Sequence, residues 1–198
     1  MQNAEIELKF RVASLAQLSN QLQSLGFSLI TPRTFEHNTL YDTPNRDLRN
    51  RGELLRLRQY GHLHLLTHKR HPDNEDAGSI YKVRIETESE VSDATALGEI
   101  FTRMGYAPVF RYEKFRSEYS DPGTQGAHMV IDETPIGIFA ELEGPTHWID
   151  RALVALGVSP GDCLTESYGR LFLTWKAETG SPAENLVFDE IDAAAAAG

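Results

Sequence analysis

The sequence predicts an α+β protein in which eight antiparallel strands close into a barrel, a tunnel with a charged interior and helices packed outside. Eight segments alternate apolar and polar residues, are joined by connections of turn length and are interrupted by three helical segments. Successive side chains of a strand point to opposite faces, and several predicted strands gather Arg, Lys and Glu on one face. This repetition favours one continuous charged surface that faces inward over separate solvated edges.

The first half of the chain is predicted to hold four strands and a helix. In residues 4–12 the apolar side chains share one face and the charged side chains share the other. Ser14 is a suitable N-cap for a helix with leucines at helical spacing, and Gly26 is a suitable end. The other predicted elements are a strand at 34–41, a turn at 42–45, a helical turn at 47–51, a hairpin of strands 53–60 and 62–70, and a loop at 71–78.

The second half is predicted to hold four more strands and three helices. The strands are expected at 79–91, 106–120, 127–133 and 136–143, and the helices at 93–104, 146–157 and 165–176. Residues 1–178 are therefore predicted to form a single domain. From about residue 179 the chain is polar and ends in an alanine run, which predicts a disordered tail over residues 179–198.

Composition excludes several classes of protein. The chain has 198 residues, enough for one domain with a sizeable core. Its net charge of −10 argues against nucleic-acid binding, so an anion site has to be a local basic enclosure. The single cysteine, Cys163, excludes an intrachain disulfide and a thiolate metal cluster. We find no apolar run that could span a bilayer and no signal peptide, so we expect a cytoplasmic protein without membrane contact.

The mixed charge of the inner strand faces has a chemical interpretation. Arg and Lys donate charge-assisted hydrogen bonds to the oxygens of a polyanion such as a triphosphate. Carboxylates on the same wall would repel that polyanion unless a divalent cation lay between them. Mg²⁺ and Mn²⁺ take oxygen ligands and share them with substrate phosphates. The charged faces therefore predict a site for a metal ion and a polyphosphate.

Short charged and aromatic motifs follow one another along the chain. They are, in order, Glu5-x-Glu7-x-Lys9, Tyr41-Asp42-Thr43, Leu55-Arg56-Leu57-Arg58, Thr67-x-Lys69, Arg84-x-Glu86-x-Glu88, Lys114-x-Arg116, Ile131-Asp132, Phe139-x-Glu141-x-Glu143 and Ser167-Tyr168. This ordered set resembles the CYTH family, the triphosphate tunnel metalloenzymes, over about residues 3–177. The family includes class IV adenylate cyclases, thiamine triphosphatases and inorganic triphosphatases, and its fold is an eight-stranded antiparallel barrel that forms a tunnel.

The resemblance implies roles for individual residues. Carboxylates that would hold Mg²⁺ or Mn²⁺ are Glu5, Glu7, Glu141, Glu143 and Asp132. Basic residues that would bind the phosphates are Lys9, Arg56, Arg58, Lys69, Arg84, Lys114 and Arg116. Catalytic roles are expected for Glu5, Glu7, Lys9 and Lys69. Glu86, Glu88 and Asp132 could instead hold basic residues in place, and Tyr168 either closes one tunnel end or packs. Arg11 and Lys82 share the inner face but fall outside the tightest motifs.

Three functions remain open from the sequence. We favour a metal-dependent triphosphatase, because hydrolysis needs only the metal-binding carboxylates and the phosphate-binding basic residues that the motifs identify. A class IV adenylate cyclase, which converts ATP to cyclic AMP and pyrophosphate, is the alternative, but no adenine pocket can be located. A non-catalytic polyphosphate-binding module would need a broken metal site. The expected partner is tripolyphosphate, ATP or thiamine triphosphate, and a homodimer is left open.

Overall fold

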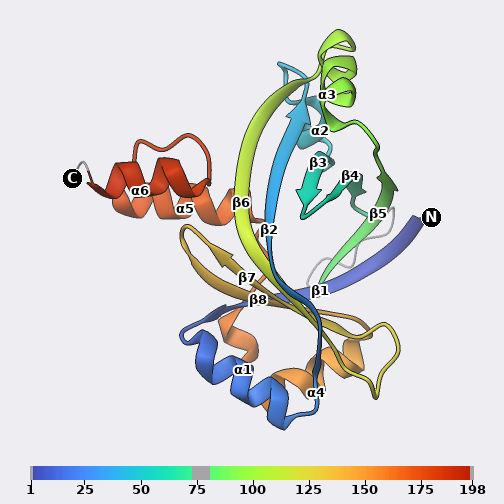
Figure 1. The fold of residues 1–198 in the computed structure, drawn as a ribbon, viewed down its shortest axis with the longest axis vertical. Helices are drawn as coiled ribbons and strands as arrows, with labels where there is room; N and C mark the ends of the chain where they lie inside the picture. Colours follow the sequence, from blue (N-terminus) through green and yellow to red (C-terminus); the bar gives the residue numbers. More distant parts are fainter. Residues whose placement is uncertain (1, 73–80, 197–198) are drawn as a thin grey trace.

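The computed structural model describes residues 2–72 and 81–196, and its main feature is a closed β-barrel (Figure 1). The strand order is β5-β4-β3-β2-β6-β7-β8-β1, neighbouring strands are antiparallel, and pairing of β1 with β5 closes the barrel. This confirms the predicted eight-stranded antiparallel barrel. The strands are β1 (Gln2–Val12), β2 (Ser28–Asp42), β3 (Leu54–Tyr60), β4 (Leu63–Arg70), β5 (Lys82–Glu90), β6 (Ala107–Ser120), β7 (His128–Thr134) and β8 (Gly137–Glu143).

The helices lie outside the barrel (Figure 1). They are α1 (Leu15–Ser24), α2 (Asp47–Asn50), α3 (Ala94–Arg103), α4 (Thr146–Leu156), α5 (Tyr168–Thr179) and α6 (Phe188–Ala196). As predicted, the Ser14 side chain caps α1, accepting a hydrogen bond from the backbone N–H of Gln17, and Gly26 follows the helix at a positive φ of 83°. No helix in the described part of the chain is long and apolar enough to cross a membrane. Most of the loop predicted at 71–78 lies outside the described residues.

The apolar face of β1 points outward and is covered by α1 and α4. Leu8 and Phe10 join a buried cluster with Leu22 of α1 and with Trp148 and Ile149 of α4. Each fully buried side chain of this size contributes about 1.5–3 kcal/mol relative to an exposed one. The helices therefore cover the apolar strand faces, and the charged faces are left to point into the barrel.

The interior of the barrel is polar. The alternation of β1 turns Glu7 and Lys9 inward while Leu8 and Phe10 pack outward, and the same alternation holds on the other strands. Among the described residues, buried polar and charged side chains on the inner faces are Glu7, Lys9, Glu36, Asn38, Arg56, Thr67, Lys114, Arg116, Asp132 and Glu141. The predicted charged interior is thus confirmed.

Strand β2 is longer than predicted. It begins at Ser28, whereas the sequence indicated a start near residue 34, after Pro32. Its pairing with β6 shifts register between Leu29 and Thr31 and again between Thr31 and Thr34. These irregularities accommodate a proline, which has no N–H to donate, inside a strand.

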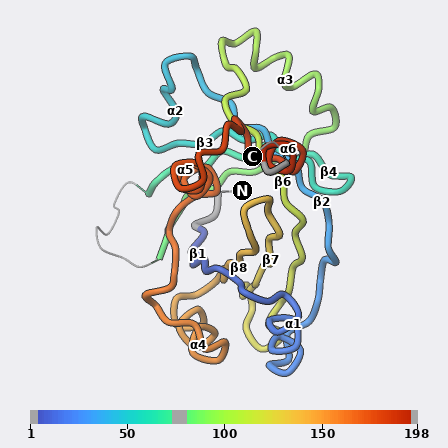
Figure 2. Tube along the Cα trace, turned by 90° about the vertical axis from the view of Figure 1, so that its left-hand side faces the viewer, coloured from blue at the N-terminus to red at the C-terminus, as the bar shows by residue number. Residues whose placement is uncertain are grey.

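The C-terminal segment, residues 181–196, differs from its prediction. The sequence indicated a disordered tail over 179–198, but in the structure α5 extends to Thr179 and a further helix, α6, follows. Leu186 and Ile191 are buried in a cluster with residues of α5. Figure 2, which is viewed from this side, shows α5 and α6 in front of the strands. The large apolar residues of this stretch, Leu186, Val187, Phe188 and Ile191, are a sequence signal that the prediction of a disordered tail overlooked.

A short strand, β9 (Cys163–Leu164), was not predicted. It follows a 3₁₀ turn at Pro160–Asp162 and pairs with β1 at Lys9 and Phe10. Strand β5 pairs only with residues 2–7 of β1. Strand β9 therefore pairs with the same edge of β1 beyond the end of β5. This pairing brings the start of α5 against the barrel.

Candidate functional site

The barrel encloses a cavity of about 900 Å³. Its wall is built mainly from charged side chains of the inward faces of the strands. The charged residues that line it are Glu5, Glu7, Lys9, Arg56, Arg58, Lys69, Lys82, Glu86, Glu88, Lys114, Arg116, Glu118, Glu141 and Glu143. A volume of this size is typical of a small-molecule site.

Three glutamates converge on one part of this wall. We call Glu5, Glu7 and Glu143 the carboxylate cluster, because one oxygen from each lies within 4.8 Å of the others. Glu5 and Glu7 come from β1, and Glu143 lies opposite Glu7 in the pairing of β1 with β8. Burial, together with the charges of Glu5 and Glu141, raises the pKa of Glu143 to about 8, although Arg116 acts to lower it. The cluster therefore concentrates more negative charge than its surroundings neutralise.

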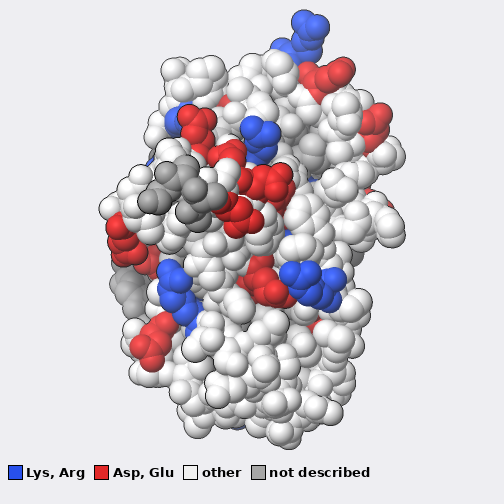
Figure 3. Space-filling view, turned by 60° about the vertical axis from the view of Figure 1, so that its left-hand side comes forward, with Lys and Arg blue, Asp and Glu red and all other residues white. Residues whose placement is uncertain are grey.

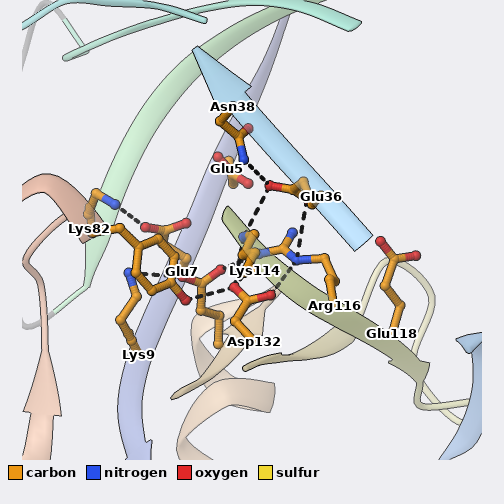
Figure 4. Close-up of polar contacts among 12 residues, drawn as sticks. Glu5, Glu7, Lys9, Glu36, Asn38, Lys82, Lys114, Arg116, Glu118 and Asp132 are labelled. Carbon is orange, nitrogen blue, oxygen red and sulfur yellow. Dashed lines mark hydrogen bonds and ion pairs between the residues drawn. The ribbon is translucent and has the colours of Figure 1, made fainter. Parts of the chain in front are cut away.

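The chemistry of the cluster fits a hard divalent cation. Carboxylate oxygens are the ligands that Mg²⁺ and Mn²⁺ take. An ion among them would offset the burial and the repulsion that together raise the pKa of Glu143. Two lysines partly neutralise the cluster in the structure. Lys69 Nζ donates to Glu5 at 2.6 Å. Lys82 donates to Glu7, as Figure 4 shows. The cluster is thus an acidic site in contact with basic residues.

The structure does not place the other two predicted metal ligands in the cluster. Glu141 forms ion pairs with Lys9 at 2.9 Å and Arg116 at 3.0 Å. Burial acts to raise the pKa of Glu141, but Lys9 and Arg116 hold it well below its usual value. Asp132 is fully buried, does not line the cavity, and accepts hydrogen bonds from Lys114 at 2.8 Å, Arg116 at 2.7 Å and the Tyr168 hydroxyl at 2.7 Å. Both carboxylates hold basic side chains in place.

Six predicted phosphate-binding residues form a second part of the wall, which we call the basic wall. Its members are Lys9, Arg56, Arg58, Lys69, Lys114 and Arg116. Lys9 and Lys114 are only 3% and 2% exposed, so their charges face the cavity and not bulk solvent. Buried cations of this kind attract an anionic ligand far more strongly than surface lysines do, because they are little screened.

Glu36 lies at the centre of the basic wall and was not predicted. Its carboxylate is fully buried and lies 3.4 Å from Lys114 (Figure 4). Arg58 lies 3.7 Å from the same carboxylate. Asn38 donates a hydrogen bond of 2.8 Å to the same carboxylate. Burial acts to raise the pKa of Glu36, but the neighbouring cations, Lys114 first, lower it well below the usual value. The sequence signal that could have identified Glu36 is its spacing: Glu36 and Asn38 are two residues apart and so share the inward face of β2.

Arg56 is held by neutral partners. Its Nη1 donates to the Tyr112 hydroxyl at 3.1 Å and its Nη2 to the Thr67 hydroxyl at 3.2 Å. The Nε atoms of Arg56 and Arg58 are buried without a hydrogen-bond partner among the described residues. Burial opposes ionisation of Tyr112, yet Arg56 and Lys114 lower its pKa overall. The cations of the basic wall therefore favour negative charge at Tyr112, and two of the wall's N–H donors have no hydrogen-bond acceptor among the described residues.

The inner face of β5 differs in detail from the prediction. Arg84 does not line the cavity; its Nη1 contacts the ring nitrogen Nδ1 of His71 at 3.0 Å and the carbonyl of Val83 at 2.8 Å. Lys82, which the motifs left aside, lines the cavity and contacts the carboxylate cluster. Glu86 forms an ion pair with Lys69 at 2.9 Å, as expected for a residue that holds a basic side chain.

Tyr168 is placed both to pack and to border the cavity. It is the first residue of α5, where Ser167 caps the helix, and it lines the cavity while being 7% exposed. Its ring lies 4.2 Å below the Nζ atom of Lys9 and 4.9 Å from that of Lys114. Tyr168 therefore covers two cations of the basic wall.

The outer surface contrasts with the cavity. On the face drawn in Figure 3, the described Lys and Arg side chains lie singly or in small groups beside Asp and Glu. In the cavity, seven described basic side chains, the basic wall and Lys82, lie close to one another, and seven glutamates line the same cavity. Basic side chains are thus gathered inside the barrel, where carboxylates balance much of their charge.

Comparison with known proteins gives relatives over most of the chain. A curated protein of Methanocaldococcus jannaschii named "Putative adenylate cyclase MJ0240" is 26% identical over 174 residues, which cover 83% of this chain and 95% of that protein. A crystal structure from Vibrio parahaemolyticus, described as a putative adenylate cyclase, superposes with a TM-score of 0.72 at 22% identity and covers 85% of this chain and 97% of the other.

A plant protein has the same fold. The structure of Hippeastrum HpAC1, described as a putative adenylyl cyclase with a dominant triphosphatase activity, superposes with a TM-score of 0.60 at 20% identity, covering 86% of this chain and 96% of the other. The model of the CYTH domain family matches residues 3–153, which is well over half of the sequence. Together with the closed barrel and its charged interior, this match shows that the chain belongs to the CYTH domain family.

Proposed function

We propose that the protein is a divalent-metal-dependent triphosphatase that hydrolyses inorganic or organic triphosphates inside the barrel. The observation that carries this proposal is the meeting of the carboxylate cluster and the basic wall in one cavity. A triphosphate has too much negative charge to approach three glutamates without a cation, and too many oxygens to be bound by the glutamates' cation alone. The two parts together meet both requirements.

The basic wall would bind the phosphate oxygens. Arg guanidinium groups donate paired hydrogen bonds to phosphate. The buried Nε atoms of Arg56 and Arg58 have no hydrogen-bond acceptor among the described residues, and a bound anion could supply one. Lys9 and Lys114 would add charge without a fixed direction. In hydrolysis, a water oxygen forms a bond to the terminal phosphorus while the bridging P–O bond breaks. The wall's cations would then neutralise the charge that develops on the leaving diphosphate.

The carboxylate cluster would hold the metal ion. A divalent ion bound there supplies Lewis acidity and neutralises phosphate charge, which is its general role in phosphoryl transfer. Glu5, Glu7 and Glu143 would orient the ion. Lys69 and Lys82, which contact Glu5 and Glu7, would shift toward the substrate or remain as balancing charges.

A class IV adenylate cyclase is the second candidate, favoured by the similarity to two proteins described as putative adenylate cyclases. In that reaction the ribose 3′-hydroxyl attacks the α-phosphorus of ATP and pyrophosphate leaves. The same basic wall and carboxylate cluster would serve, but the cavity would also have to seat adenine and ribose. The plant relative described as having a dominant triphosphatase activity supports hydrolysis as the first choice.

One incubation series distinguishes the candidates. The purified protein is incubated with tripolyphosphate, ATP or thiamine triphosphate in Mg²⁺ or Mn²⁺, and phosphate and cyclic AMP are both measured. The double variant Glu5→Gln/Glu7→Gln should lose activity, whereas Glu99→Gln, an exposed glutamate on α3, should keep it.

Each outcome of the series assigns one function. Phosphate release that depends on Glu5 and Glu7 establishes the triphosphatase and ranks its substrates. Cyclic AMP formed from ATP establishes the cyclase. Tight binding of tripolyphosphate without either product would overturn both enzymatic assignments and leave a polyphosphate-binding module.

A further inference from the structure

Strand β6 has an edge that the barrel itself leaves unpaired. Along one edge β6 pairs with β2 over nearly its whole length, but on the other edge β7 reaches only residues 115–120. The backbone groups of residues 111–113 on that second edge therefore have no partner within the eight-stranded barrel. A buried edge without partners would be costly, and an exposed one would be open to another chain.

The C-terminal segment occupies this edge. Leu186 pairs with Tyr112 in a parallel bridge: the N–H of Glu113 donates to the Leu186 carbonyl at 2.9 Å, and the N–H of Leu186 donates to the Arg111 carbonyl at 3.0 Å. The side-chain oxygen of Asn185 accepts from the N–H of Arg111 at 2.9 Å. Three hydrogen bonds to the backbone of β6 thus attach the segment where β7 has ended.

The side chain of Leu186 packs against the aromatic residues that border the cavity. It is fully buried in one cluster with Tyr112 and Tyr168. The rings of Tyr112 and Tyr168 stack with centroids 6.0 Å apart. Leu186 is therefore linked to Tyr112 in two ways, by the backbone bridge and by membership of the same buried cluster.

Tyr112 in turn orients Arg56. The guanidinium of Arg56 has two hydrogen bonds, one to the Tyr112 hydroxyl and one to Thr67, and its carboxylate neighbours Glu86 and Glu88 are more distant, at 3.7 and 4.0 Å. Loss of the tyrosine partner would leave Arg56 with one close contact. Its position in the basic wall therefore depends on where Tyr112 is held.

We infer that Leu186 is a positioning residue for the substrate site: the C-terminal segment completes the wall of the tunnel and, through Tyr112, holds Arg56 in the geometry that binds the phosphates. This inference rests on the proposed function. Leu186 does not line the cavity, so its effect passes through Tyr112.

The test compares Leu186→Ala with three other variants in steady-state hydrolysis of tripolyphosphate. Leu186→Ala should raise KM about tenfold, the size expected when one hydrogen bond to a charged group is lost, with kcat little changed. Leu186→Met, which keeps the volume, should behave like the wild type. Leu173→Ala removes an exposed leucine from α5 and is the matched control. Circular dichroism and thermal melting set an assay temperature at which every variant is folded.

A double-mutant cycle separates positioning from stability. Tyr112→Phe should raise KM on its own, and adding Leu186→Ala to it should raise KM little further, because both changes act on the same contact with Arg56. A merely structural role would lower the active fraction, so kcat would fall in every background and KM would stay constant. That pattern would overturn the inference.

The inference and the proposed function fail in different ways. If the wild type hydrolyses tripolyphosphate and Leu186→Ala keeps its KM, the positioning role is wrong and the function stands. If the wild type neither binds nor hydrolyses tripolyphosphate, the proposed function is wrong, and the positioning role, which rests on it, is wrong with it.

Discussion

Glu36 lies beneath the basic wall with its Oε1 atom 3.4 Å from the Nζ atom of Lys114, and both side chains are buried. Arg58 and Arg116 approach the same carboxylate at 3.7 and 4.0 Å. One buried anion is therefore the shared counter-ion of three cations. Removing one partner of a buried ion pair is far more costly than replacing the whole pair, because the remaining charges stay desolvated.

We predict that Glu36→Gln lowers the free energy of unfolding by about 3–5 kcal/mol, as measured by urea denaturation. Glutamine keeps the shape of the side chain and can still accept the hydrogen bond from Asn38. The decrease in the free energy of unfolding therefore measures the effect of removing the negative charge. Tripolyphosphate should raise the melting temperature of the variant more than that of the wild type, since the ligand resupplies negative charge to the wall. Equal shifts would contradict this role. The exposed Glu178→Gln is the control.

The same residue predicts a dependence of stability on acid. The cations around Glu36 lower its pKa in the folded protein, so the folded chain binds fewer protons there than the unfolded chain does. The stabilisation is then complete above the unfolded pKa of about 4.3 and is lost as the pH falls below it. Urea denaturation between about pH 6 and pH 3 should show a smaller loss of stability in Glu36→Gln than in the wild type. An equal loss would show that the pKa of Glu36 does not differ between the folded and the unfolded chain, and would contradict this role.

Much of the fold and of the site could be predicted because strand alternation alone decides which residues face inward. Glu5, Glu7 and Lys9 are spaced by two, so once β1 is a strand they share a face. Glu36 was missed because its inward neighbour on β2 is the neutral Asn38, and a single acid beside an amide does not mark a charged face.

The grouping of residues on that inner surface depends on the register between strands, which spacing does not reveal. Glu141 and Glu143 both face inward, but the pairing of β1 with β8 sets Glu141 opposite Lys9 and Glu143 opposite Glu7. One glutamate therefore becomes an ion-pair partner and the other joins the carboxylate cluster. The packing of Leu186 on β6 is a tertiary contact of the same kind, without a local signal.

The position of Asp132 gives a prediction that separates the two parts of the cavity. Asp132→Asn should leave the affinity for Mg²⁺ unchanged, because Asp132 contacts Lys114 and Arg116 and lies outside the carboxylate cluster. It should weaken binding of tripolyphosphate about tenfold. Unlike Glu36, Asp132 accepts direct hydrogen bonds from Lys114 and Arg116 and so fixes the orientation of both side chains. Isothermal titration calorimetry measures both affinities. A loss of Mg²⁺ binding would return Asp132 to the set of metal ligands that the sequence predicted.

Glu143 predicts how stability and metal binding change with pH. Burial and the neighbouring carboxylates raise its pKa to about 8, so between about pH 4.3 and pH 8 the folded chain holds a proton that the unfolded chain has released. The free energy of unfolding of the metal-free protein should therefore fall as the pH rises through that range. Glu143→Gln should flatten this dependence, whereas Glu99→Gln should not.

Mg²⁺ should stabilise the protein more as the pH rises, because it competes with the Glu143 proton for the same oxygens. The rise in melting temperature that Mg²⁺ produces should be larger at about pH 9 than at about pH 6, where the ion has to displace the proton. Differential scanning fluorimetry with Mg²⁺ or with a chelator measures both conditions. In Glu143→Gln the shift should be small at either pH, because one of the three carboxylates of the cluster is gone. A shift that is equal at both pH values, and that survives in Glu143→Gln, would place the metal ion elsewhere in the cavity.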